Sequence, residues 1–410
     1  MKHLGKFLVL FICFCKTLYG DFCNEISDKL SLIIEETNGI YGKFDRVIPF
    51  PDQGGSFINQ IYLVYTDRGE TFVLKVENPH WKSQKTINEV LTLNYLNHNT
   101  SILVPKVLAY ENVIDHSPID REYILMTHMR GSPLNHEFKR IYSNPVIYRN
   151  VLEQLATILG ELKQLSFPII GSFTYPDDLK LQCPVDLINL GYNTPCLSFS
   201  EYARRWLSYF LQEMKRLKIS GHQNSQYFEK YIPQVQQLLY SPCLEKLDKD
   251  REIFLFSHQD FVMKNILIED TTITAILDWE WSGTAPIEFE AKSGCDFLLT
   301  DEDVSIFNSM LEEKGIFNFF DPPSPARQIF YEAMGELYTL ISCYEWIEGK
   351  LEHSAKFLDQ KLEQRRVRTL KTFDMESYIF EITTLLDKHF LEINKDLLSV
   401  SYTHLRAHET

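Results

Sequence analysis

The sequence lacks the motifs of several large classes of protein. Its eight cysteines are scattered, with no C-x-x-C pair and no cluster with histidine, which argues against a zinc site or a dense disulfide framework. Neither H-E-x-x-H nor G-x-S-x-G occurs, so a zinc or serine hydrolase has little support. No internal repeat, heptad run or low-complexity stretch is present. These absences leave a globular protein without a repeat architecture.

The chain is also short of positive charge. It carries 41 lysine and arginine residues against 56 aspartate and glutamate residues, a formal net charge of −15. This balance disfavours binding to a nucleic-acid backbone and is compatible with a cationic substrate. With 410 residues, of which 44% are hydrophobic, the chain can bury a large core, and its length is typical of two lobes or domains.

The two ends of the chain differ from the rest. In residues 1–20, two lysines precede the apolar run Phe7–Cys15, which is too short to span a bilayer. This segment is either a secretory signal peptide or a buried or interfacial N-terminal helix, because Leu18 stands where a cleavage site needs a small residue. Residues 399–410 lack apolar periodicity and are predicted to be an unstructured or appended tail.

Residues 21–128 carry a β-rich pattern with one helix. Four runs are typical of strands, namely Ile58–Thr66, Thr71–Val76, Val104–Tyr110 and Glu122–Met126. A helical pattern covers Gln84–Leu96. An N-terminal nucleotide-binding lobe, built from an antiparallel sheet and one helix, is therefore predicted for residues 21–128.

Residues 129–398 are mainly helical in pattern. Helical spacing is clearest in Val146–Leu165, Ser200–Leu217, Gln328–Trp346 and Phe373–Leu391. Short β-like runs interrupt them at Ile253–Phe256, Ile266–Ile268 and Ile273–Leu277. The predicted fold class is α+β, with two lobes and a mainly helical C-terminal one for catalysis and substrate binding.

The short β-like runs bracket an ordered set of polar residues. His258, Asp260 and Asn265 have the spacing H-x-D-x4-N, and Asp278 ends a later run. Phosphoryl transfer needs a carboxylate that accepts the proton of the incoming hydroxyl, and two oxygen ligands that hold Mg²⁺ against the phosphates. The two aspartates and the asparagine can supply these groups. Lys264 can offset charge on the γ-phosphate, although a loop lysine is more often exposed.

Each of these residues alone has a simpler explanation. A single Asp or Asn in a loop is most often a turn former or a helix cap, and a single His is most often a satisfied polar residue. The ordered set is more specific, because hydrophobic strands bracket both halves of it. The set therefore indicates chemistry in addition to local structure.

The segment HQDFVMKNILIEDTTITAILDWEW resembles the catalytic and metal-binding motifs of the aminoglycoside phosphotransferase and choline kinase family. The resemblance extends in layout over roughly residues 40–390, although only the motifs are specific, and it implies a protein-kinase-like fold. It further implies that Asp260 is the catalytic base, that Asn265 and Asp278 bind Mg²⁺, and that His258 supports the catalytic loop.

The chain departs from the pattern of protein kinases. Gln259 stands where protein kinases have Arg and where the phosphotransferases frequently have Gly, and Asp278-Trp279-Glu280 replaces D-F-G. No A-P-E segment follows. These departures favour a small-molecule acceptor over a protein substrate.

Two residues of the N-terminal lobe fit the same chemistry. Lys75 is the only charged residue of Thr71–Val76, where the kinase fold places the lysine that contacts the α- and β-phosphates. Glu89 lies in the following helical pattern with apolar neighbours that can turn its carboxylate toward Lys75. The alternative is that both are surface charges. We expect an ion pair that orients Lys75.

The remaining nucleotide-binding segments are less distinctive. Gly54, Gly55 and Ser56 let backbone N–H groups approach a phosphate, but G-x-G-x-x-G is absent and a Gly-Gly pair is more often a plain turn. Met126 and His128 belong to a segment that resembles the family's hinge strand, whose backbone meets adenine. By sequence alone, that segment is an ordinary buried strand.

The function predicted is transfer of the γ-phosphate of ATP, with Mg²⁺, to a hydroxyl of a small acceptor, which the net charge allows to be cationic. The alternatives are a catalytically weak kinase-like nucleotide-binding protein and a protein kinase. No nucleic-acid partner and no stable membrane span are expected, and the oligomeric state is left open. Dependence on ATP favours the cytoplasm, unless residues 1–20 direct the chain to the secretory pathway or a membrane.

The acceptor is expected between Asp260 and the helical C-terminal region. Four residues near the metal loop offer carboxylates and an indole that suit an ammonium group, namely Glu280, Trp281, Glu288 and Glu290. For any one of them, packing in the core or exposure to solvent is the alternative.

Overall fold

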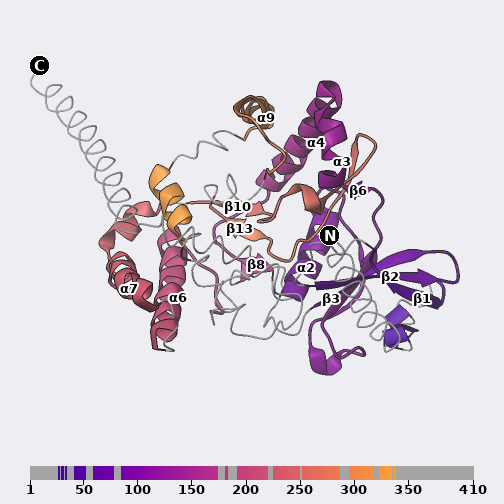
Figure 1. Cartoon of the computed structure of the whole chain (residues 1–410), viewed down its shortest axis with the longest axis horizontal. Coiled ribbons are helices and arrows are strands. Elements are labelled where there is room, and N and C mark those ends of the chain that lie inside the picture. The colour runs from indigo at the N-terminus through magenta and orange to yellow at the C-terminus, as the bar shows by residue number, and fades with distance from the viewer. Residues whose placement is uncertain are drawn as a thin grey trace, which may run out of the picture.

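The computed structural model describes residues 26–27, 29–31, 33–34, 41–51, 59–77, 85–173, 181–182, 192–219, 225–249, 252–286, 295–316, 324–334 and 337. These residues form an α+β fold with a five-stranded sheet at one end and the helices α6 and α7 at the other (Figure 1). The two-lobed fold class expected from the sequence is confirmed.

The large sheet is antiparallel throughout, with the strand order β1-β2-β3-β5-β4. Its strands are β1 (Phe44–Pro49), β2 (Asn59–Thr66), β3 (Thr71–Glu77), β4 (Val107–Glu111) and β5 (Tyr123–Thr127). Helix α2 (Lys85–Asn99) follows β3, and the 3-10 helix η1 (Ile114–His116) lies between β4 and β5. The strand β4 begins three residues later than expected, directly after Pro105 and Lys106; a proline has no N–H for a sheet ladder.

Strand alternation decides which way Lys75 points. Phe72, Leu74 and Val76 belong to the apolar cluster on one face of the sheet, together with buried residues of the segment 26–34. Val73 packs instead with the cluster that contains the apolar side of α2. Because successive side chains of a strand point to opposite faces, Lys75 shares the α2 side with Val73.

The helical part is organised around two apolar cores. Its helices are α3 (Leu134–Tyr142), α4 (Pro145–Gln164), α6 (Phe199–Ile219), α7 (Ser225–Leu239) and α9 (Asp301–Glu313), with the 3-10 helices η2 (Pro242–Leu247) and η3 (Met263–Asn265). Helices α4 and α9 share a core with α2, whereas α6 and α7 share one with Ala326, Phe330, Ala333, Met334 and Leu337. The start of α4 is well defined, since the Asn144 side chain accepts hydrogen bonds from the backbone N–H of Val146 and Ile147.

Three small sheets hold the loops that carry the polar motif. The first sheet joins β10 (Phe254–Ser257), β13 (Gly283–Ala285) and β7 (Ser166–Phe167). The second sheet joins β11 (Ile266–Glu269), β12 (Thr272–Ile276) and β6 (Ser132–Pro133). In the third sheet, β8 (Ser172–Phe173) pairs with β9 (Leu181–Gln182). The motif residues therefore follow β10 and β12 directly, on the short connections from β10 to β11 and from β12 to β13 that join the two three-stranded sheets.

Several expectations lie outside the described residues. They are residues 1–20, the loop with Gly54, Gly55 and Ser56, the helix at Phe373–Leu391, the two glutamates Glu288 and Glu290, and residues 399–410. The helix expected at Gln328–Trp346 is helical where it is described, at 325–334 and 337. Within the described ranges, no helix combines the length and apolar character needed to cross a bilayer. The lobe boundaries stay predictions.

Candidate active site

His258 joins the two loops of the polar motif. It is fully buried after β10, and its Nδ1 accepts a hydrogen bond from the backbone N–H of Asp260 at 3.2 Å. Its Nε2 therefore carries the proton and donates to the carbonyl of Leu277 at 2.8 Å. Burial lowers the pKa of His258, which favours the neutral ring. The ring centroid lies 4.3 Å from that of Trp279. His258 thus ties the loop that carries Asp260 to the loop that carries Asp278.

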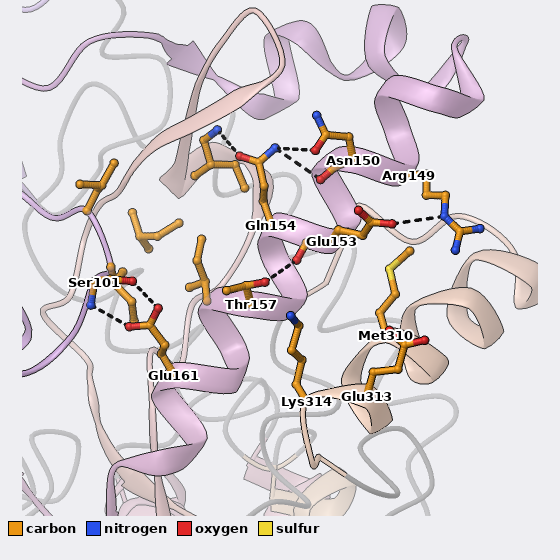
Figure 2. A pocket seen from close by; sticks show the side chains of 15 residues that line it. Ser101, Arg149, Asn150, Glu153, Gln154, Thr157, Glu161, Met310, Glu313 and Lys314 are labelled. Atoms are coloured by element: carbon orange, nitrogen blue, oxygen red, sulfur yellow. Dashed lines mark hydrogen bonds and ion pairs between the residues drawn. The ribbon is translucent and has the colours of Figure 1, made fainter.

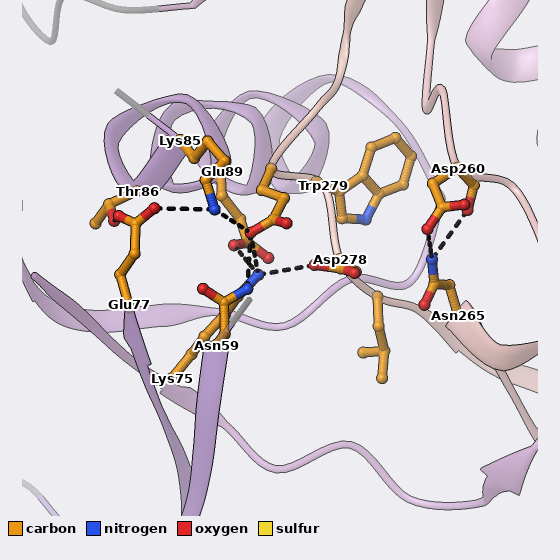
Figure 3. A network of polar contacts seen from close by, with 12 residues as sticks. Asn59, Lys75, Glu77, Lys85, Thr86, Glu89, Asp260, Asn265, Asp278 and Trp279 are labelled. Atoms are coloured by element: carbon orange, nitrogen blue, oxygen red, sulfur yellow. Dashed lines mark hydrogen bonds and ion pairs between the residues drawn. The ribbon is translucent and has the colours of Figure 1, made fainter. Parts of the chain in front are cut away.

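Asp260 and Asn265 are in direct contact. The side-chain amide of Asn265 donates to the Asp260 carboxylate Oδ2 and to its backbone carbonyl, both at 2.9 Å (Figure 3). The Asp260 side chain is 32% exposed, and the more exposed Lys264 ammonium lies 3.0 Å from Oδ2. Because the amide nitrogen faces Asp260, Asn265 Oδ1 has no hydrogen-bond donor among the described residues and can ligate a cation.

Two residues of these loops have left-handed backbone conformations. Gln259 has φ 63° and Asp278 has φ 66°. Asp tolerates this region, whereas a longer side chain is strained there, which gives a physical reason for the glycine that related phosphotransferases frequently have at the position of Gln259.

Replacing Gln259 by Gly is expected to stabilise the fold. Relief of the left-handed strain contributes about 1–2 kcal/mol, and the greater backbone entropy of glycine in the unfolded chain offsets about half of it, for a net gain of up to about 1 kcal/mol. Urea unfolding of the wild type, Gln259→Gly and Gln259→Ala measures this gain. Gln259→Ala is the control, because alanine keeps the Cβ that is strained in the left-handed conformation. Equal stability of Gln259→Gly and Gln259→Ala would show that the backbone at this position is not strained.

Lys75 lies among three carboxylates (Figure 3). Its Nζ is 2.6 Å from Glu89, 2.8 Å from Asp278 and 3.1 Å from Glu280. The ion pair with Glu89 that the sequence suggested is present, and Asp278 joins it from the far loop. These three carboxylates approach one another within 4.8 Å, a spacing that suits a cation, and the Lys75 ammonium is the cation that they surround.

The charges of this group shift one another's pKa values. Burial alone would lower the pKa of Lys75, but Asp278, Glu280 and Glu89 raise it well above its ordinary value. Burial would likewise raise the pKa of Asp278, yet the Lys75 charge keeps it below the ordinary value. Burial raises the pKa of Glu89 to about 7, with Lys75 opposing. Lys75 is therefore charged and Asp278 ionised at neutral pH.

Glu280 does not lie where the sequence placed it. It was expected to face an acceptor near Asp260, but its side chain is 4% exposed and its Oε2 accepts from Asn59 at 2.8 Å and lies near the ammonium groups of Lys75 and Lys85. Trp281 packs against Lys85, whose Nζ is 5.6 Å from a ring centroid of the indole. The expectation that Glu280 binds the acceptor is therefore wrong, because two ammonium groups and Asn59 already surround its buried carboxylate. Contact of Trp281 with the acceptor stays a prediction.

A second carboxyl pair lies beside this network. Glu122 immediately precedes β5, and burial, together with the negative charge of Glu77, raises its pKa from 4.5 to about 8. The folded protein therefore holds a proton that the unfolded chain releases between pH 4.5 and 8. Stability contributed by protonated Glu122 is complete below pH 4.5 and is lost as the pH rises toward 8.

Glu122→Gln is expected to flatten this decline, because an amide keeps the shape of the protonated acid and does not titrate. Chemical unfolding of both proteins across pH 4.5 to 8 measures the difference. Glu70→Gln, on the exposed turn between β2 and β3, is the control and should follow the wild type. Parallel curves for the wild type and Glu122→Gln would rule out a raised pKa of Glu122.

The expected hinge residues lie on and just after β5. Met126 is 7% exposed and pairs with Val73 of β3 and Val107 of β4, so β5 lies between two strands at this residue. His128 is exposed immediately after the strand. Their contact with adenine stays a prediction.

A cavity of about 610 Å³ lies elsewhere, between α4, α9 and the connection from α2 to β4 (Figure 2). Its lining includes Ser101, Glu153, Glu161, Ile276 and Lys314. None of the residues expected to bind nucleotide or metal lines it. This cavity is therefore distinct from the candidate active site.

Comparison with known proteins places the chain in a family. The family model described as "Phosphotransferase enzyme family" matches residues 51–326, and the chain belongs to this family. The gentamicin complex of APH(2")-IIa is similar in structure, with a TM-score of 0.53 and 12% identity over 84% of this chain and 97% of that one. At this identity, the likeness shows the protein-kinase-like fold.

Curated relatives match a smaller part of the chain. "Altered inheritance of mitochondria protein 9, mitochondrial" of Debaryomyces hansenii is 28% identical over 158 residues, which are 36% of this chain and 24% of the yeast protein. The protein of the same name from Saccharomyces cerevisiae is 27% identical over 130 residues, 30% of this chain and 21% of that protein. The chain thus matches less than a quarter of the length of these relatives. Their names include a mitochondrial location, and the cytoplasmic location stays a prediction.

Sequence reasoning missed the residues that complete the network, chiefly Lys85 and Asn59. One signal for Lys85 was present, since it precedes Glu89 by four residues and so lies on the same side of the helix. No comparable pattern marks Asn59, because its contact with Glu280 joins residues 221 positions apart.

Proposed function

We propose that the chain transfers the γ-phosphate of ATP to a hydroxyl of a small molecule, with Asp260 as the catalytic base. One observation carries this proposal. His258 links the loop of the partly exposed Asp260 carboxylate to the loop of Asp278. The Asp278 carboxylate in turn pairs with Lys75. A base, two oxygen ligands and a phosphate-binding lysine are the parts that phosphoryl transfer requires. The family assignment supports the same reaction class.

In the proposed reaction, the acceptor oxygen forms a bond to the γ-phosphorus as the bond to the β,γ-bridging oxygen breaks and ADP leaves. Asp260 accepts the hydroxyl proton. The Asn265 amide holds the Asp260 carboxylate in one orientation, and the Lys264 ammonium lies 3.0 Å from the same oxygen, Oδ2, where it can limit negative charge. His258 is buried and acts as a positioning residue, which is the supporting role that the resemblance implies.

Asn265 and Asp278 fit the expected Mg²⁺. Both offer oxygen atoms, which a hard cation prefers, and Asn265 Oδ1 is left open by the direction of its amide. Asp278 is ionised, as a ligand must be, and its side chain is 32% exposed. When bound, the cation neutralises charge on the phosphates.

The acceptor is proposed only as a small molecule with a hydroxyl group. The position of Glu280 in the buried network weakens the argument for a cationic acceptor, which then rests on the net charge of −15 and on residues whose contact with an acceptor stays a prediction. Amino-alcohols, aminoglycosides and neutral sugars are the classes to test.

ADP release by the purified chain, with Mg-ATP and a panel of these acceptors, tests the proposal. We expect release that depends on one acceptor class and well exceeds ATP hydrolysis in its absence. Tight ATP binding without release for any acceptor would favour the kinase-like binding protein. Transfer of label to added proteins alone would favour a protein kinase.

A further inference from the structure

Lys85 is a buried lysine in an unfavourable position. It is 1% exposed and is the first residue of α2, where the helix dipole repels positive charge. Burial of an ammonium group adds a desolvation cost, so its neighbours must compensate for both effects. Such an arrangement is unlike an exposed lysine that serves solubility.

The compensation comes from two glutamates. Lys85 Nζ lies 2.9 Å from Glu77 Oε1 and 3.4 Å from Glu280 Oε2. The same Oε2 atom is 3.1 Å from Lys75 Nζ and accepts a hydrogen bond from Asn59. One carboxylate oxygen of Glu280 therefore lies between two ammonium groups, one of which belongs to the proposed phosphate site.

The backbone of Glu280 is held in place by hydrogen bonds from α2. On α2, Asn88 donates hydrogen bonds to the carbonyl of Glu280 at 3.1 Å and to that of Ser282 at 2.9 Å, while Thr92 bonds the Ser282 hydroxyl at 2.8 Å. The backbone of Glu280 is thus fastened to the helix that carries Lys85. If Lys75 moves toward a nucleotide, Glu280 stays behind.

A nucleotide phosphate must compete with three carboxylates for Lys75. Asp278 can turn to the cation that accompanies ATP, and Glu89 remains beside Lys75. Glu280 would lose a partner, and a buried charge left without a partner is strongly destabilising. Lys85 is the group that keeps Glu280 neutralised.

We propose that Lys85 is a positioning residue for ATP binding. By sharing Glu280 Oε2, it weakens the hold of Glu280 on Lys75 and pairs with Glu280 once Lys75 contacts the phosphates. This inference rests on the proposed function, in which Lys75 binds the nucleotide. Lys85 acts through Glu280 and touches neither ATP nor the acceptor.

The test is a cycle of three variants, Lys85→Met, Glu280→Gln and the two combined, in the full chain with Mg²⁺. Calorimetry gives the Kd for ATP, and steady-state kinetics separate KM from kcat. Without Lys85, Lys75 is the one of these two ammonium groups that remains beside Glu280, so Lys85→Met should raise the Kd and the KM for ATP by about tenfold or more, with a smaller change in kcat.

Rescue distinguishes this role from a structural one. Glu280→Gln removes the charge that competes for Lys75, so it should bind ATP at least as tightly as the wild type. The combined variant should return to within about threefold of Glu280→Gln, because the effect of Lys85 passes through Glu280. Lys215→Met, on the exposed side of α6, controls for loss of a positive charge and should bind ATP as the wild type does.

Each other outcome counts against the inference. An unchanged Kd in folded Lys85→Met, or a combined variant as weak as Lys85→Met alone, would overturn it. If Lys85→Met fails to fold, Glu280→Gln decides, since weaker ATP binding by this variant contradicts the competition. If the wild type binds no ATP, the proposed function is overturned as well. If the wild type binds ATP and Lys85→Met binds it with the same Kd, only the inference about Lys85 is overturned.

Discussion

Asp260→Asn is expected to lower phosphoryl transfer by about 10²–10⁴, the usual loss when a positioned acid or base is removed. The amide keeps the shape of the side chain and an oxygen that accepts from Asn265, so the loop should keep its conformation. It loses the ion pair with Lys264, which is exposed and worth at most about 1 kcal/mol. Folding and ATP binding should therefore remain close to those of the wild type.

Asp270→Asn is the matched control for this change. Asp270 lies on the exposed turn between β11 and β12 with φ 55°, a conformation that asparagine also tolerates. The same chemical change there should leave the rate unaltered. Equal rates for the wild type and Asp260→Asn would remove Asp260 from the reaction.

Asp278→Asn is expected to have the second large effect, on the Mg²⁺ dependence of ATP binding. Asparagine tolerates the left-handed backbone at this position, so the substitution changes the charge without the strain that alanine would add. A hard cation prefers a carboxylate to an amide. The Mg²⁺ concentration for half-maximal binding of ATP should rise by about 100-fold, because even substitutions of residues that only contact the metal ligands lower metal affinity by about 10–100-fold.

Asn265→Ala is expected to have a smaller effect on the same measurement, because an amide offers the cation only a dipole. It should also slow turnover, since the Asp260 carboxylate loses its hydrogen bond from Asn265. If neither variant altered the Mg²⁺ dependence, the assignment of both ligands would be wrong.

The sequence was most informative about the candidate site where several functional groups lie within a short stretch. The motif from His258 to Asn265 lies on one loop, so its spacing alone suggests which groups meet. The pairing of Lys75 with Glu89 was predictable because one strand and the next helix place both side chains. The direction of the Glu280 side chain was not predictable from the sequence, because a buried carboxylate beside a metal-binding loop can face either lobe. Its partners Asn59 and Lys85 also come from distant segments of the chain.

Three elements of the fold were also missed. The strand β1 is an edge strand with only Val47 buried, and α7 contains Pro233, which a helix interior usually excludes. The helix α9 begins with three acidic residues, although its capping box between Thr300 and Asp303 was a readable start signal. Pairing with β2, which a local pattern does not contain, decides β1, whereas the sequence did hold local signals for α7 and α9.

Transfer of label from γ-³²P-ATP to a small acceptor, compared between the wild type and Asp260→Asn, tests the central claim most directly. The account predicts a labelled small-molecule product from the wild type in the presence of Mg²⁺, and a rate about 10²–10⁴ lower for Asp260→Asn at equal occupancy of the ATP site. A labelled product that forms equally fast in both proteins would contradict the account. So would ATP bound by the wild type with no label passing to any hydroxyl acceptor.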